Sequence, residues 1–296
     1  MILESEKILK KKPLIKWGWV RALLFFVSGF GVMAIYRPVR DFLLHDNGIN
    51  SGFEYLFLAR SLKLSFFLLL IYLMRKLVDR KSFKSIGFDL ASPFRKDLFI
   101  GLISGVGMVA VIFTILKLTG QIEIVGTGFP TYELFLVAGI MFVIAVMEEL
   151  IYRIYLLVNL TLSMNKYVAL AITSILFTLI HADNTGVTLL GLVNIFLIAV
   201  LLGGYYIYRK NVWFPIALHF SWNFALGSIF GSAVSGNSVP SIFKIDILGS
   251  EFMTGGEFGF EGSILTTILF IIAIILMQLK FGKKSILDNK LNANNI

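Results

Sequence analysis

Two adjacent glutamates and an arginine lie in one of the most apolar stretches of the chain, VMEELIYRIY at residues 146–155. Ionisable side chains are costly inside a membrane, and those found there usually serve a function. On a helix, Glu149 and Arg153 are four residues apart and can form an ion pair on one face. Glu148 points about 100° away, where its own face offers no neutralising partner. We interpret Glu148 as the reactive carboxylate, whereas the Glu149–Arg153 pair could also be purely structural.

Two histidines and an asparagine occupy other apolar stretches at helical spacing. His181 follows Phe177 by four residues and Asn223 follows His219 by four, so each pair shares a helix face. A buried carboxylate beside a histidine can hold and deprotonate a water molecule. A second histidine and an amide can donate hydrogen bonds to the oxyanion of a tetrahedral intermediate. Taken singly, these polar groups could instead join neighbouring helices. Taken together with Glu148, they favour a peptide-bond hydrolase without a covalent nucleophile.

Glu148 and His181 are predicted to lie at the same depth. Their midpoint in the sequence falls in the polar turn LSMNK at residues 162–166. Residues equidistant from the turn of an antiparallel hairpin lie at similar depth, here ~25 Å along each helix. We therefore expect His181 to be the partner of Glu148. The same helical rise places His219 and Asn223 ~13 and ~19 Å from the basic connection that follows residue 208, within reach of the same layer.

The sequence lacks the residues that other classes of protease require. The chain has no cysteine, which excludes thiol nucleophiles, thiolate metal ligands and disulfides. The HExxH pattern of zinc proteases does not occur. The aspartates lie in connections or near the ends of apolar stretches. The nearest match to a GxSG serine motif, LISG at 102–105, lacks the first glycine.

The composition is that of a membrane protein with several spans. Of the 296 residues, 57% are hydrophobic and 15% are charged, whereas soluble domains carry about 25% charged residues. A helical span takes ~20 mostly apolar residues. We predict an all-α polytopic membrane protein that forms a single membrane domain over residues 1–296. Its eight expected spans are 17–36, 61–77, 98–118, 132–160, 167–182, 187–207, 212–231 and 263–281.

Basic residues favour one orientation of these spans. The N-terminal segment, the even-numbered connections and the C-terminal segment carry lysines and arginines, whereas the third and fifth connections carry none. Because cytoplasmic connections are enriched in Lys and Arg, both termini are predicted to be cytoplasmic (N-in, C-in). The first connection contradicts this pattern with Arg37, Arg40, Arg60 and Lys63. We assign the net charge of +9 to contact with an anionic leaflet of the lipid bilayer, and not to nucleic acid.

Three motifs, in order along the chain, resemble a known family. EELIYR at 148–153, FTLIH at 177–181 and HFSWN at 219–223 fit the pattern EExxxR, FxxxH and HxxxN. That pattern is similar to the CPBP family, which comprises the type II CAAX prenyl endopeptidases and the Abi bacteriocin-processing or immunity proteins. The flanks GGYYIYRKNVWFPIAL and GGEFGFEGS are also similar. The resemblance covers roughly residues 84–281, with its motifs within 148–223.

This resemblance implies an intramembrane endopeptidase, a multi-pass protein of the cell membrane whose eight helices enclose a cavity open to the cytoplasmic side. Its substrate would be a membrane-associated peptide or protein, with or without an attached lipid. By motif, Glu148 would activate water with the help of His181. His219 and Asn223 would form the oxyanion hole.

The resemblance gives the Glu149–Arg153 pair the task of orienting and tuning Glu148, and it leaves the metal question open. Family members are often described as metalloproteases, and Glu148, His181 and His219 could ligate zinc. We favour a reaction without a cofactor, because these ligands would have to come from three separate helices.

Two other classes of function compete with the protease. A bacteriocin-immunity or regulatory scaffold could keep the fold without catalysis, although its motifs would then be free to decay. A transporter could relay protons through the carboxylates, but the sequence shows no inverted repeat of the kind common in transporters.

Overall fold

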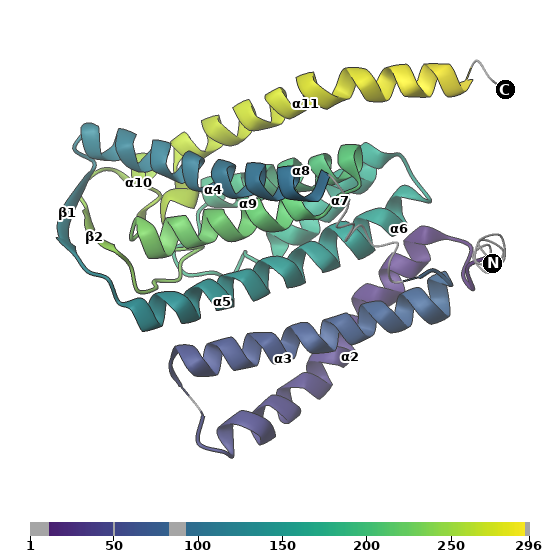
Figure 1. Cartoon of the computed structure of the whole chain (residues 1–296), viewed down its shortest axis with the longest axis horizontal. Helices are drawn as coiled ribbons and strands as arrows, with labels where there is room; N and C mark the ends of the chain where they lie inside the picture. The colour runs from purple at the N-terminus through teal and green to yellow at the C-terminus, as the bar shows by residue number, and fades with distance from the viewer. Residues whose placement is uncertain (1–11, 50, 83–92, 294–296) are drawn as a thin grey trace.

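Each of the eight apolar stretches forms a helix in the computed structural model, which describes residues 12–49, 51–82 and 93–293 (Figure 1). Several of these helices end in, or pass through, a π-helical segment. The helices are α2 (Gly18–Arg40), α3 (Gly52–Leu73), α4 (Pro93–Leu118), α5 (Thr131–Glu149), α6 (Val158–Thr161), α7 (Lys166–Leu179), α8 (Leu189–Arg209), α9 (Trp213–Phe224), α10 (Glu251–Thr254) and α11 (Ile264–Ala293). The π-helical segments are η1 (Asp41–His45), η2 (Met74–Asp79), η4 (Leu150–Leu157) and η5 (Ala225–Ile229), and two short 3₁₀ turns are η6 (Gly256–Phe258) and η7 (Phe260–Gly262).

The class of an all-α, multi-pass membrane protein is confirmed. Within the described residues, six helices are long and apolar enough to cross a membrane. The α7 helix has 14 residues and α9 has 12, so neither reaches the length of a full span by itself. Eight crossings and a cytoplasmic N-terminus therefore stay predictions. Figure 1 places the start of α2 and the end of α11 at the same end of the bundle.

A two-stranded sheet caps the opposite end of the bundle, which the sequence analysis did not anticipate. Strand β1 (Ile122–Thr127) pairs antiparallel with β2 (Phe243–Ile247), and a bulge between Ile124 and Gly126 shifts the register. The sheet joins the connection after α4 to the long connection after α9 (Figure 1). It therefore ties together the outer ends of helices that are far apart in the sequence.

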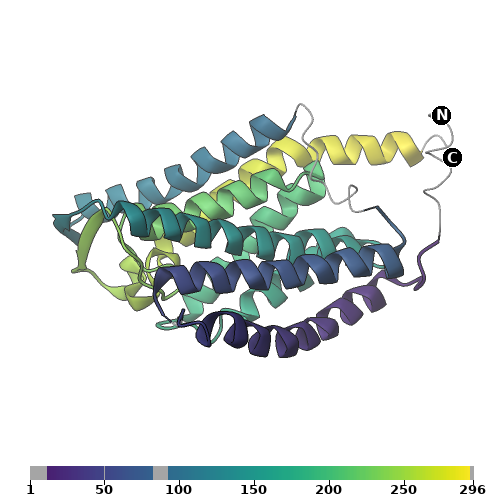
Figure 2. The same cartoon turned by 60° about the horizontal axis from the view of Figure 1, so that its bottom comes forward.

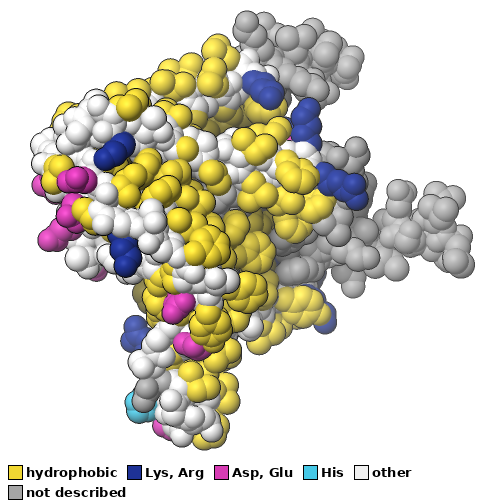
Figure 3. Space-filling view, turned by 60° about the vertical axis from the view of Figure 1, so that its left-hand side comes forward, with side chains coloured by type: hydrophobic (Ala, Val, Ile, Leu, Met, Phe, Trp, Pro, Cys, Tyr) yellow, Lys and Arg dark blue, Asp and Glu magenta, His cyan; other side chains and the backbone are white. Residues whose placement is uncertain are grey.

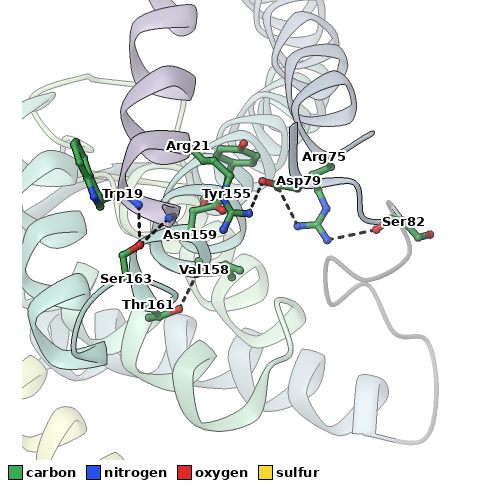
Figure 4. A network of polar contacts seen from close by, with 11 residues as sticks. Trp19, Arg21, Arg75, Asp79, Ser82, Tyr155, Val158, Asn159, Thr161 and Ser163 are labelled. Carbon is green, nitrogen blue, oxygen red and sulfur yellow. Dashed lines mark hydrogen bonds and ion pairs between the residues drawn. The ribbon is translucent and has the colours of Figure 1, made fainter. Parts of the chain in front are cut away.

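Helices α2 and α3 form an antiparallel hairpin on one side of the bundle, where α3 packs against α5 (Figures 1 and 2). A buried ion cluster holds the hairpin's ends together (Figure 4): Arg21 Nη1 lies 2.9 Å from Asp79 Oδ1, and Arg75 Nη1 lies 3.9 Å from Asp79 Oδ2. Ser163 Oγ, in the α6–α7 turn, accepts a hydrogen bond of 2.7 Å from the backbone N–H of Gly18. The hairpin is thus fixed to the helix that carries the two glutamates.

Helices α4 and α9 approach closely because two glycines of α4 face α9. A Cβ atom added at Gly101 would lie 2.7 Å from the carbonyl oxygen of Phe214. One added at Gly105 would lie 2.7 Å from the backbone nitrogen of Trp222. The GxxxG spacing removes side chains from one face of a membrane helix and lets backbones touch. This contact fixes α9, the helix that carries His219 and Asn223.

The outer surface of the bundle is largely apolar. Figure 3, seen toward the sheet end, shows hydrophobic side chains across the bundle, with acidic side chains gathered on the left and basic ones both among them and on the right. Large apolar side chains that face outward include Ile103, Phe135, Leu189 and Ile275. Exposed apolar area on this scale is unusual for a soluble monomer, and it matches a surface that faces lipid.

Candidate active site

The two glutamates lie where an α-helix changes into a π-helix. The α5 helix ends at Glu149, and η4 and α6 continue it without a break to Thr161. Such π-helical turns within α-helices frequently mark functional sites. Glu149 is fully buried, and its Oε1 lies 3.0 Å from Arg153 Nη1. The structure thus contains the ion pair expected from the spacing of four residues.

His219 bridges both glutamates. Its Nδ1 lies 3.0 Å from Glu149 Oε1, and its Nε2 lies 3.8 Å from Glu148 Oε2. The sequence analysis paired Glu149 with Arg153 alone and placed His219 with the oxyanion. The additional contact joins α5 to α9 across 70 residues of sequence. Spacing within one helix carries no information about such a contact.

His181 lies just beyond the end of α7, in a turn. Its Nδ1 lies 2.9 Å from the carbonyl oxygen of Phe177. A carbonyl only accepts hydrogen bonds, so Nδ1 carries the proton and Nε2 of the neutral ring keeps a free lone pair. His181 and Glu148 face the same cavity but form no direct hydrogen bond in the described part of the chain. The expected depth match stays a prediction, and the imidazole that lies within 4 Å of Glu148 is that of His219.

Phe177 is the aromatic centre of the site, a role that the sequence analysis missed. The guanidinium of Arg153 lies 4.6 Å from the centre of its ring. The same ring lies 5.0 Å from the imidazole of His181 and 6.2 Å from that of His219. A cation over an aromatic face is attracted by the ring quadrupole. Phe177 therefore fixes Arg153 and orients both histidines, which explains the aromatic position in the FxxxH motif.

A cavity of about 510 Å³ brings the predicted reactive groups together. Glu148, His181, His219 and Asn223 all line it. Asn223 forms no hydrogen bond with another described residue, so its amide is free toward the cavity. The side chains of Glu149 and Arg153 lie behind this wall, which agrees with a supporting position.

The α2–α3 hairpin closes the cavity with apolar and basic side chains. Phe25, Phe30 and Met33 line it from α2, and Arg60 and Lys63 line it from α3. The sequence analysis placed these two cations in or next to a connection, because apolar windows start the span at residue 61. The helix in fact begins at Gly52, so both cations lie inside it.

Glu261 is a further buried carboxylate on the cavity wall that the sequence analysis did not single out. Its Oε1 accepts a hydrogen bond of 3.0 Å from Trp222 Nε1, and its Oε2 accepts one of 2.7 Å from Ser235 Oγ. It therefore fastens the long connection after α9 to the end of α9. The signal that could have found it is its place in GGEFGFEGS, beside the last span.

The metal alternative can be compared with the arrangement of possible ligands. Zinc ligands lie about 2.0–2.3 Å from the ion, so three of them must converge on one point. Among the described residues, no three His, Asp or Glu side chains gather in such a way. The hydrogen bond from His181 Nδ1 to a backbone carbonyl is compatible with either mechanism, because histidines that bind a metal through Nε2 commonly make it too.

A comparison with protein families finds one match. Residues 129–225 match the family described as Type II CAAX prenyl endopeptidase Rce1-like, which confirms the resemblance and spans all three motifs. At the family level, this match supports a CAAX-type intramembrane protease. No curated protein and no solved structure matches the chain. The wider region expected from the resemblance starts at residue 84, which lies outside the described residues.

Proposed function

We propose that this protein is an endopeptidase of the cell membrane that hydrolyses a peptide bond with water activated by Glu148. One observation carries the proposal: Glu148, His181, His219 and Asn223, from three distant parts of the chain, line a single cavity. The family match adds support for a protease. The substrate is a membrane-associated peptide or protein, with or without a lipid, that enters from the cytoplasmic side.

Glu148 is suited to hold and deprotonate the water. Its carboxylate accepts no hydrogen bond from a described residue, and its side chain is 14% exposed and lines the cavity, so a water molecule can donate to it. The hydroxide formed attacks the peptide carbonyl carbon, and the proton passes to Glu148. When the C–N bond breaks, that proton is delivered to the leaving amine. His181, with a free Nε2, assists this transfer.

His219 and Asn223 are suited to stabilise the oxyanion. Because His219 Nδ1 faces the Glu149 carboxylate, that nitrogen carries a proton. Its Nε2 can donate to an oxyanion only if the ring is an imidazolium. The positive charges of this imidazolium and of Arg153 then balance the negative charges of Glu148 and Glu149. The Asn223 amide supplies the second donor.

The test uses purified full-length protein in lipid vesicles and a library of membrane-anchored fluorogenic peptides. Wild-type protein should cleave members of the library, and Glu148→Gln should lower kcat by about 10²–10⁴-fold, the usual contribution of a general base. Glu123→Gln, which changes an exposed carboxylate on β1, serves as the control and should cleave normally. Equal turnover by Glu148→Gln would contradict the proposed base and would favour the scaffold.

A chelator separates the two mechanisms for water activation. In the proposed mechanism, prolonged treatment with a zinc chelator leaves the cleavage rate unchanged. Loss of cleavage that added zinc restores would assign Glu148, His181 and His219 to a metal instead. Comparing membrane peptides of cells with and without the protein would then identify the natural substrate.

A further inference from the structure

Two cations on the cavity wall have no counterion. Arg60 and Lys63 are three residues apart, so they share one face of α3. Both line the cavity and are half-buried. Neither forms an ion pair or a hydrogen bond with any residue that the structure describes. A charged side chain within a membrane span normally pairs or faces a functional pathway, so two unpaired ones at one place require an explanation.

Their depth argues against a lipid headgroup as the missing partner. Arg60 lies ~12 Å and Lys63 ~17 Å along α3 from its start at Gly52, at ~1.5 Å per residue. The helix and its π-helical extension run from Gly52 to Asp79, which is longer than the ~30 Å hydrocarbon core. A span centred in the bilayer therefore places the Cα atoms of both residues inside the core, and both side chains line the cavity, whereas headgroup phosphates lie at the surface of the core.

The same cavity is also lined by the groups proposed for catalysis. The charge of Glu148 acts on Lys63, although no ion pair forms between them. A volume of about 510 Å³ is that of a small-ligand pocket, so it admits a short stretch of peptide. An anionic group of that peptide would meet the two cations while a nearby peptide bond meets Glu148.

We propose that Arg60 and Lys63 bind a carboxylate of the substrate peptide and thereby select which peptides are cut. This specificity role rests on the proposed endopeptidase function. The carboxylate can come from the C-terminus of the peptide or from an Asp or Glu side chain. Arginine binds it with a planar pair of N–H donors and lysine with a point charge. The negative charge of the bound carboxylate neutralises positive charge in the cavity that has no partner among the described residues.

Binding to a cleavage-blocked protein tests this proposal without relying on turnover. Full-length Glu148→Gln protein in phosphatidylcholine nanodiscs is titrated with three matched pools of labelled acyl-hexapeptides. The pools carry a free C-terminus, a C-terminal amide, or an amide with one internal glutamate. The free-acid or glutamate pool should bind more tightly than the plain amide, and the stronger of the two identifies the source of the carboxylate. Adding Arg60→Gln and Lys63→Gln should weaken that pool by about tenfold or more and leave the amide pool unchanged.

Arg37→Gln is the matched control. Arg37 is exposed on α2, does not line the cavity, and is close enough for its charge to act on Lys63. It should leave the binding of all three pools unchanged. The proposal would be overturned if Arg60→Gln and Lys63→Gln weakened the binding of the carboxylate pools and of the plain amide pool equally. It would also be overturned if the Glu148→Gln protein bound all three pools with the same affinity. Stabilisation by phosphatidylglycerol that depends on Arg60 and Lys63, without acid selectivity, would assign them to lipid phosphate.

The binding result and the proposed hydrolysis can fail separately. If carboxylate peptides bind through Arg60 and Lys63 but wild-type protein never cleaves them, the endopeptidase function fails while the anion site stands. If cleavage depends on Glu148 but ignores the carboxylate, the anion site fails alone.

Discussion

The two adjacent glutamates should respond in opposite ways to substitution. Glu149 is fully buried and lies 3.0 Å from both Arg153 Nη1 and His219 Nδ1. Replacing it with alanine leaves a buried guanidinium without its counterion, and breaking a buried pair from one side typically costs about 3–5 kcal/mol. Glu148 has a side chain that is 14% exposed, and its nearest charged atom lies 3.8 Å away. Glu148→Gln keeps the size of the side chain and breaks no close ion pair, so it should cost far less unfolding free energy than Glu149→Ala.

The assay measures both properties on the same preparations. Unfolding free energies come from denaturation in mixed detergent and SDS micelles, and cleavage rates come from the fluorogenic peptides. Glu149→Ala should unfold far more easily, whereas Glu148→Gln should fold normally and not cleave. Adding Arg153→Met to Glu149→Ala should recover part of the lost stability, because it removes the unpaired buried cation. This division of roles would be refuted if the Glu149→Ala protein were as stable as the wild type. It would also be refuted if Glu148→Gln and Glu149→Ala lowered the unfolding free energy equally.

Three further predictions concern the groups around the site. Gly105→Ala should lower the unfolding free energy by about 1–3 kcal/mol through overpacking against α9, and it should also lower the cleavage rate. Gly107 faces open space, so Gly107→Ala should change neither quantity. Denaturation and cleavage assays of both variants check this prediction. Asp79→Ala should cost about 3–5 kcal/mol in unfolding free energy because it strands two buried arginines, whereas Asp41→Ala removes only an exposed pair and should cost below about 1 kcal/mol. His181→Ala should lower kcat by about 10²–10⁴-fold with KM unchanged, and a steady-state titration that showed only a higher KM would make it a binding residue.

Interactions within one helix could be predicted from the sequence, because helical spacing is regular. The Glu149–Arg153 pair follows from a spacing of four residues, and so does the placement of His181 on the face of Phe177. The hairpin turn also follows, because its polar residues interrupt an apolar run, and it placed Glu148 and His181 on one cavity. The helical class followed from composition alone.

Interactions between helices could not be predicted in this way. The contact of His219 with Glu149 depends on how α9 is placed against α5, and the GxxxG spacing of Gly101 and Gly105 in α4 indicates close helix packing without naming the partner helix. The short sheet was missed because β1 and β2 are separated by more than a hundred residues. Local patterns carry no information about which distant segment supplies the partner.

The α2–α3 hairpin shows what this limit hides from a motif-based interpretation. The three motifs and the family match lie between residues 129 and 225, so they describe only part of the cavity wall. The rest of the wall comes from the connection after α9, from Glu261, and from α2 and α3, where Arg60 and Lys63 line the cavity. If the motif residues carry out the reaction, substitutions on this hairpin can change how well a peptide fits the cavity without disturbing the motif residues. Specificity should therefore follow changes on the hairpin, whereas turnover should follow changes in the motifs.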